Sequence, residues 1–150
     1  MDERPYPEGI DCCWLAYDRD GHLGVFVTSG RGPVPVPALL ETYPLDDIEE
    51  RLLALPKASD IDLRVRMPRP NRFVAFAERG VFVFDWSDVH RTEAYIDEYE
   101  LVAFPYRPLT LDQLPDDLAD AARSIRFNQI AFASAWRIDV RAHLTCREAP

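Results

Sequence analysis

Two apolar runs near the start of the chain, residues 12–17 and 22–28, constrain the fold most. The sequence DRDG separates them, and its glycine, Gly21, can adopt a positive φ. This spacing predicts a β-hairpin. Both faces of the first run are apolar, which favours a central strand over an edge strand. The sequence SGRGPVPVP that follows contains alternating prolines, so we expect it to form an extended surface loop.

Three later segments have helical patterns. Residues 44–55 begin with proline and acidic residues and place apolar side chains along one side of a helix. Residues 115–125 have the same arrangement, with Asp116 and Asp117 in the first turn. The segment between Asn71 and Gly80 fits a short helix with these residues as its N-cap and its C-terminal glycine, although its aromatic and β-branched residues also suit a strand.

The other apolar segments have strand patterns. Residues 60–67 alternate between apolar and polar side chains, as expected for a half-exposed strand, and residues 81–86 and 99–106 read as buried strands. Residues 127–133 and 137–144 are expected to be the last two strands. Strict β-α-β alternation is absent. We therefore predict an α+β fold: a mostly antiparallel sheet of about six strands, with two or three short helices packed mainly on one face.

Length and charge limit the architecture and the partners. A chain of 150 residues fits a single domain spanning residues 1–150, of which we expect residues 1–10 to be poorly ordered. The formal net charge of -9 repels phosphate backbones and anionic membranes, which argues against nucleic acid and membrane partners. The sequence contains no apolar run of about 18 residues and no leader signature, so a cytoplasmic location is expected.

The cysteines and histidines give no strong chemical signal. The three cysteines are Cys12, Cys13 and Cys146, an odd number that argues against a disulfide framework and fits buried thiols in a reducing compartment. His22 and His143 have no recognisable partner in the sequence. The glycines near Ser29 do not form a phosphate-binding loop, because proline follows the second glycine and offers no N–H group.

A cluster of reactive residue types follows the strand at residues 81–86. Asp85, Asp88 and His90 lie within a span of six residues where that strand ends. In one interpretation they only terminate the strand and lie in solvent. In a second they form a polar partner-binding surface, and in a third they perform acid-base or metal chemistry. The set lacks the ligand spacing of known zinc sites, so we expect no bound metal, no cofactor and no catalytic residues.

Acidic residues gather in three parts of the chain: Asp46, Asp47, Glu49 and Glu50; Glu93, Asp97, Glu98 and Glu100; and Asp112, Asp116, Asp117 and Asp120. Each cluster alone fits a solvated surface or the first turn of a helix. Two clusters that shared a surface with exposed aromatic residues such as Tyr95 or Tyr99 would suit a basic protein partner. The contact surface that we expect consists of Asp85, Asp88, His90, Glu93, Tyr95, Asp97 and Glu98.

Four segments, WLAYDRDGHLGVFVTSGRGPVP, AERGVFVFDWSDVH, YELVAFPYRPLTLDQLP and IRFNQIAFASAWRIDV, resemble a family of small uncharacterised bacterial proteins. The resemblance covers most of residues 11–140. It implies a shared fold and an association with immunity proteins of bacterial toxin systems, and it assigns no catalytic role to any residue.

These observations favour a non-enzymatic cytoplasmic binding protein. We expect an immunity-type protein that neutralises a basic partner, such as a toxin, through an acidic surface. The alternative is a small metal-dependent or acid-base hydrolase that uses Asp85, Asp88 and His90. A third possibility, a structural domain of another role, also stays open.

Overall fold

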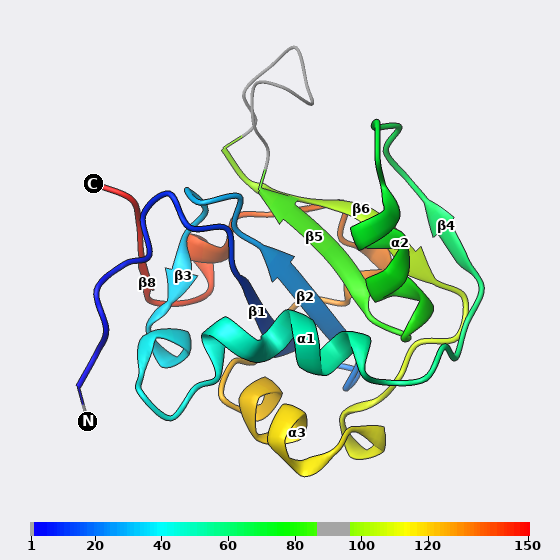
Figure 1. Cartoon of the computed structure of the whole chain (residues 1–150), viewed down its shortest axis with the longest axis horizontal. Helices are drawn as coiled ribbons and strands as arrows, with labels where there is room; N and C mark the ends of the chain where they lie inside the picture. Colours follow the sequence, from blue (N-terminus) through cyan, green and yellow to red (C-terminus); the bar gives the residue numbers. More distant parts are fainter. Residues whose placement is uncertain (1, 87–96) are drawn as a thin grey trace.

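The computed structural model describes residues 2–86 and 97–150, and a curled mixed sheet of six strands forms its centre (Figure 1). The strand order is β1-β2-β5-β6-β4, and β7 also pairs with β6. β2 and β5 are parallel, whereas the other pairs described in this sheet are antiparallel. The predicted α+β fold with a mostly antiparallel sheet is therefore confirmed. The strands of this sheet are β1 (Cys13–Tyr17), β2 (Leu23–Val27), β4 (Ile61–Leu63), β5 (Phe82–Trp86), β6 (Tyr99–Pro105) and β7 (Arg137–Ile138).

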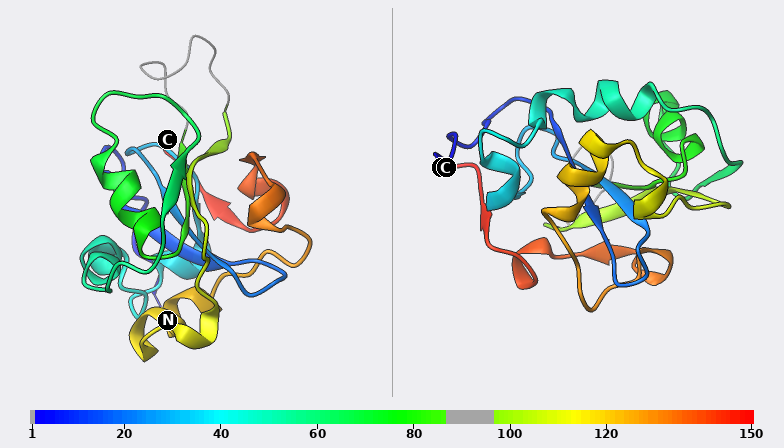
Figure 2. Two further views of the ribbon diagram at one scale, coloured as in Figure 1. Left: turned by 90° about the vertical axis from the view of Figure 1, so that its right-hand side faces the viewer. Right: turned by 90° about the horizontal axis from the view of Figure 1, so that it is seen from below.

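Three α-helices cover the sheet, as the sequence predicted. They are α1 (Ile48–Leu53), which extends the short helix η2 (Leu45–Asp47), α2 (Asn71–Glu78) and α3 (Asp116–Arg123). Both α1 and α2 lie on one side of the sheet, and the C-terminal segment drawn in orange lies on the other (Figure 2). Helix α2 begins at Asn71 itself, with Pro70 as its N-cap, so the predicted capping role of Asn71 is wrong. No helix of the described residues is long and apolar enough to span a bilayer.

The predicted hairpin is confirmed, but its first strand is not central. β1 pairs with β2 in antiparallel register and ends the strand order of the sheet. Its side chains are nevertheless buried on both faces, because α1, α3 and the chain after α3 cover this edge. Tyr17 N–H donates to the carbonyl of Ile125, and Phe127 N–H donates to the carbonyl of Tyr17. An edge strand that is covered in this way has the same apolar pattern as a central one.

A tyrosine completes the hydrogen bonding of this edge. The hydroxyl of Tyr43, which is 3% exposed, accepts a bond of 2.7 Å from Leu15 N–H and donates one of 3.0 Å to the Leu15 carbonyl. A side chain thus replaces the neighbouring strand at this position. Buried backbone groups need such partners because an unpaired one costs free energy.

Stacked aromatic rings fill the sheet face opposite α1 and α2. Trp14 stacks on Phe26 with 4.1 Å between ring centroids, and Phe26 stacks on Phe84 at 4.8 Å. Phe127 and Phe132, from the C-terminal segment, pack against Phe26. Each ring of this size buries a large apolar area, so this row is a major part of the core.

Two segments differ from their predicted structures because of these core contacts. The predicted surface loop after β2 is largely buried and contains β3 (Val34–Pro35) and η1 (Val36–Leu39). A Cβ atom at Gly32 would lie 2.5 Å from the hydroxyl of Tyr99, so glycine serves close packing there. Strand β3 pairs with β8 (Cys146–Arg147), a strand that the sequence did not indicate.

The C-terminal segment has much less strand than its alternating pattern predicted. Residues 127–133 contain no strand and end in η4 (Phe132–Ser134), while residues 137–144 contain only β7 and η5 (Val140–Ala142). The carboxylate of Asp139 accepts a bond from Arg141 N–H and starts η5, which ends the extended conformation. Strand β4 is likewise shorter than predicted and stops at Leu63.

We expect Tyr43→Phe to lower the free energy of unfolding by about 1–3 kcal/mol, because the substitution leaves the buried N–H and carbonyl of Leu15 unpaired. Urea unfolding followed by circular dichroism measures the change. Tyr106→Phe is the matched control, since Tyr106 is 60% exposed and its substitution should change stability by less than about 0.5 kcal/mol. Equal stabilities of the two variants would contradict the role of Tyr43.

Candidate functional site

Asp85 lies inside the protein, at the end of the sheet where β2 and β5 end and β1 begins. Asp85 is 5% exposed, and its Oδ1 accepts a hydrogen bond of 3.0 Å from Ser29 Oγ. Across the strands it is paired with Glu100, which is 7% exposed and lies 3.5 Å from Arg64 Nη1. Asp85 is therefore held by the core rather than free in solvent.

The other residues of the expected contact surface are placed only in part. Asp88, His90, Glu93 and Tyr95 lie outside the described residues. Whether Asp85 meets Asp88 and His90 therefore stays a prediction, and so does the hydrolase interpretation.

Asp97 and Glu98, which precede β6, are described. Arg141 donates to the backbone carbonyl of Asp97 at 2.7 Å and to its carboxylate at 3.3 Å, and Glu98 is partly buried. Tyr99, suggested as an exposed aromatic residue, is fully buried, and its hydroxyl donates to the Pro33 carbonyl. The prediction that Tyr99 could anchor a partner is wrong.

An acidic hollow of about 410 Å³ lies between the start of β1 and α1. Its acidic residues include three that the sequence had grouped at the start of α1: Asp46, Glu49 and Glu50. Its lining residues are Ile10, Asp11, Cys12, Cys13, Leu45, Asp46, Glu49, Glu50 and Leu53.

Ser29 connects Asp85 to this acidic hollow. Its side chain donates to Asp85, and its backbone N–H donates to Asp11 Oδ1 at 3.0 Å. Ser29 has φ 53°, a left-handed conformation that is uncommon for residues other than glycine. Asp11 then binds Arg72, whose Nη1 lies 2.6 Å from Asp11 Oδ2 and whose Nη2 lies 2.5 Å from Glu49 Oε1. One continuous set of polar contacts therefore runs from β5 to α1.

The electrostatics of the acidic hollow favour cations. Arg72 neutralises part of the charge of Asp11 and Glu49, and Arg4 lies 3.3 Å from Asp46 at the rim. Glu50 is exposed, as is Asp46, whose side chain is 80% exposed. Four carboxylates thus meet two guanidinium groups, which leaves the hollow negative.

The thiols of the hollow are not suited to nucleophilic chemistry. Burial raises the pKa of Cys13, and the charge of Arg72, which acts in the opposite direction, does not offset it. Burial also raises the pKa of Cys12. A thiol must ionise to act as a nucleophile, so both groups serve as packing residues, as the sequence analysis expected.

Two of the acidic clusters meet at Arg51, a short distance along α1. Its Nη1 lies 2.8 Å from Asp117 of α3 and its Nη2 lies 3.7 Å from Asp47. Figure 1 shows α1 and α3 side by side at the lower edge of the molecule. Acidic residues from two helices therefore share one side of the surface, which meets one part of the condition predicted for partner binding. The other part was an exposed aromatic residue, and of the two suggested Tyr99 is buried and Tyr95 lies outside the described residues.

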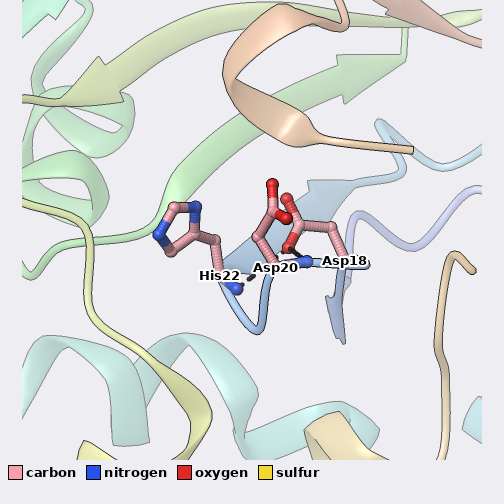
Figure 3. Close-up of side chains that lie close together, drawn as sticks. All are labelled: Asp18, Asp20 and His22. Carbon is pink, nitrogen blue, oxygen red and sulfur yellow. Dashed lines mark hydrogen bonds between the residues drawn. The ribbon is translucent and has the colours of Figure 1, made fainter. Parts of the chain in front are cut away.

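A second polar group lies in the turn between β1 and β2 (Figure 3). Asp18 is fully buried, and its Oδ1 accepts bonds of 2.9 Å from the backbone N–H groups of Asp20 and His22. Its Oδ2 accepts a bond of 2.8 Å from Phe132 N–H, which lies 114 residues away in the sequence. Asp18 thus shapes the turn and fixes the C-terminal segment against the sheet.

The same turn also brings together three side chains that can bind a metal, the carboxylates of Asp18 and Asp20 and the imidazole of His22. One side-chain ligand atom from each lies within 4.8 Å of the others, which makes this the group of described residues that could hold a metal ion. In the sequence, DRDG was interpreted only as a turn, and His22 had no recognisable partner. The signal it contained was the alternation of Asp, Asp and His at positions 18, 20 and 22.

Comparison with known proteins gives no relative for this chain: family models, curated proteins and solved structures all yield no match. The resemblance to a bacterial family therefore stays a prediction, and the site must be interpreted from its own geometry.

We expect Asp18→Asn to lower the free energy of unfolding by about 2–4 kcal/mol, because the amide has one acceptor oxygen where three N–H donors converge. Urea unfolding measures the change. Asp20→Asn, the same substitution at an exposed position two residues away, is the control and should unfold like the native protein. An Asp18→Asn protein as stable as this control would show that the three bonds contribute little.

Proposed function

We propose that the protein is a non-enzymatic cytoplasmic binding protein of the immunity type, which neutralises a basic protein partner. The acidic hollow is the contact site, and the partner inserts a lysine- or arginine-bearing segment into it. The partner in this proposal is a toxin whose own site is covered by the complex.

The observation that carries the proposal is the combination of carboxylates and apolar side chains in one hollow. Leu45 and Leu53 line it together with Ile10, which is 61% exposed, while Asp46 and Glu50 supply exposed charge. Lysine and arginine place an aliphatic stem on apolar surface and a charged head among carboxylates. The lining therefore complements both parts of such a side chain.

The overall charge supports the same kind of partner. A net charge of -9 attracts a basic protein over long range and accelerates its encounter with the hollow. Asp85 contributes indirectly, because it holds Ser29, which in turn holds Asp11 at the rim. The raised pKa of Cys13 supports a binding role over a thiol-dependent catalytic one.

Charge reversal in the hollow tests the proposal. With the protein encoded beside this chain's gene as the ligand, we expect Asp46→Lys combined with Glu50→Lys to raise the Kd at least 100-fold, about 2.7 kcal/mol, because like charges then face the partner. Isothermal titration calorimetry measures the Kd. Growth of cells that express the partner with each variant shows whether neutralisation is lost as well.

Asp60→Lys combined with Asp62→Lys is the matched control. Both residues are exposed, and the change in net charge is the same, but neither lines the hollow. This variant should bind and rescue growth nearly as well as the native protein. If both double variants lost the same affinity, overall charge rather than the hollow would determine binding, which would contradict the proposed contact site. A native protein that does not bind the neighbouring gene product would also contradict the proposal.

A further inference from the structure

We propose that the turn between β1 and β2 binds a divalent transition-metal ion through Asp18, Asp20 and His22. The proposal concerns a different part of the molecule from the acidic hollow and does not depend on the proposed function. The ion belongs to the class of Zn²⁺ and Mn²⁺.

The spacing of the three residues brings their side chains to the same place. They occupy alternate positions across the turn, and their ligand atoms lie within 4.8 Å of one another. Oxygen and nitrogen ligands bind Zn²⁺ at about 2.0–2.2 Å in a tetrahedral arrangement, so two ligands of one ion are about 3.4 Å apart. Asp20 is exposed, and rotation of its side chain closes the remaining gap.

Asp18 has an acceptor position left for an ion. A carboxylate offers about two acceptor positions on each oxygen. Oδ1 uses both for the N–H groups of Asp20 and His22, while Oδ2 receives only Phe132 N–H among the residues that the structure describes. The backbone bonds also fix the orientation of the carboxylate, so little conformational entropy is lost when it binds a metal.

The imidazole of His22 provides an independent indication of a ligand. Its Nδ1 is buried and has no hydrogen-bond partner in the described part of the chain. Buried polar atoms are nearly always paired, and an unpaired one commonly marks the position of a water or an ion. The ring also lies against Phe82, at 6.0 Å between centroids, which limits its motion. Figure 3 shows the three side chains grouped at the turn.

The mixture of ligands selects the class of ion. Ca²⁺ and Mg²⁺ prefer oxygen ligands alone, whereas an imidazole combined with carboxylates suits first-row transition metals. Arg19 Nε lies 3.9 Å from Asp20 Oδ1, in a pair whose side chains are both more than half exposed. This guanidinium competes with the ion for the carboxylate. Because Asp20 reaches solvent, water can complete the coordination.

Isothermal titration calorimetry of the whole chain, with ZnCl₂ or MnCl₂ as the titrant, tests the site. We expect one ion per chain, with affinity at least 100-fold weaker in His22→Gln and in Asp20→Asn, because removal of a direct ligand exceeds the 10- to 100-fold effect of outer contacts. His143→Gln and Asp60→Asn are the matched controls, since both residues are exposed and lie outside the cluster. These two variants should bind like the native protein.

The affinity of the Arg19→Gln variant for the metal separates a metal site from a cluster with a purely structural role. Removal of the competing charge should tighten metal binding several-fold. Circular dichroism confirms that each variant is folded. Three results would overturn the proposal: a native Kd weaker than about 1 mM, the same affinity in the His22→Gln and His143→Gln proteins, or Ca²⁺ binding that equals Zn²⁺ binding and is unaffected by His22→Gln.

Discussion

The buried carboxylate of Asp18 is the interaction on which most of this structure depends. It closes the hairpin of β1 and β2 through two backbone N–H groups and holds Phe132 through a third. The ring of Phe132 lies over Gly24, where a Cβ atom would come within 2.8 Å of it. The same carboxylate therefore links the turn to the segment that covers the aromatic face of the sheet. Three N–H donors offset the cost of burying the charge.

A second set of polar contacts organises the opposite end of the hairpin. Each residue of this set contacts the next in space, in the order Asp85, Ser29, Asp11, Arg72 and Glu49. The contacts bring together β5, the loop after β2, α2 and α1. The single guanidinium of Arg72 brings two carboxylates together, while further carboxylates at the rim keep the hollow negative. A hollow with this excess of carboxylates attracts cations, and this is the basis of the proposed binding of a basic partner.

Local sequence patterns were sufficient to predict most helices and strands but not the place of each strand in the sheet. The hairpin, the three helices, β5 and β6 follow from apolar periodicity and from Gly21 and Gly80, both of which have positive φ. The position of β1 at an edge could not be predicted, because α1, α3 and Tyr43 hide it as a neighbouring strand would. The alternation in residues 137–144 was misleading because Asp139 starts a turn there.

The sequence likewise predicted one part of the candidate site, its acidic residues, but not the contacts that assemble it. The acidic residues before and within α1 were visible as a cluster in the sequence. Their combination with Asp11 and Arg72 was not, because these residues are 61 positions apart and meet only through the fold. The burial of Tyr99 was also hidden, since its partners Trp14 and Pro33 lie far away in the sequence. Contacts between distant residues leave no periodic pattern.

Hydrogen exchange of the Phe132 amide, measured by nuclear magnetic resonance, tests the central role of Asp18 most directly. The amide belongs to a short 3-10 helix near the exposed residue Asn128, and it donates a hydrogen bond to the Asp18 carboxylate in the hairpin turn. If Asp18 couples the C-terminal segment to the sheet, this amide exchanges only on global unfolding, as slowly as those of Phe26 and Phe84. Exchange as fast as that of Asn128 would contradict the account.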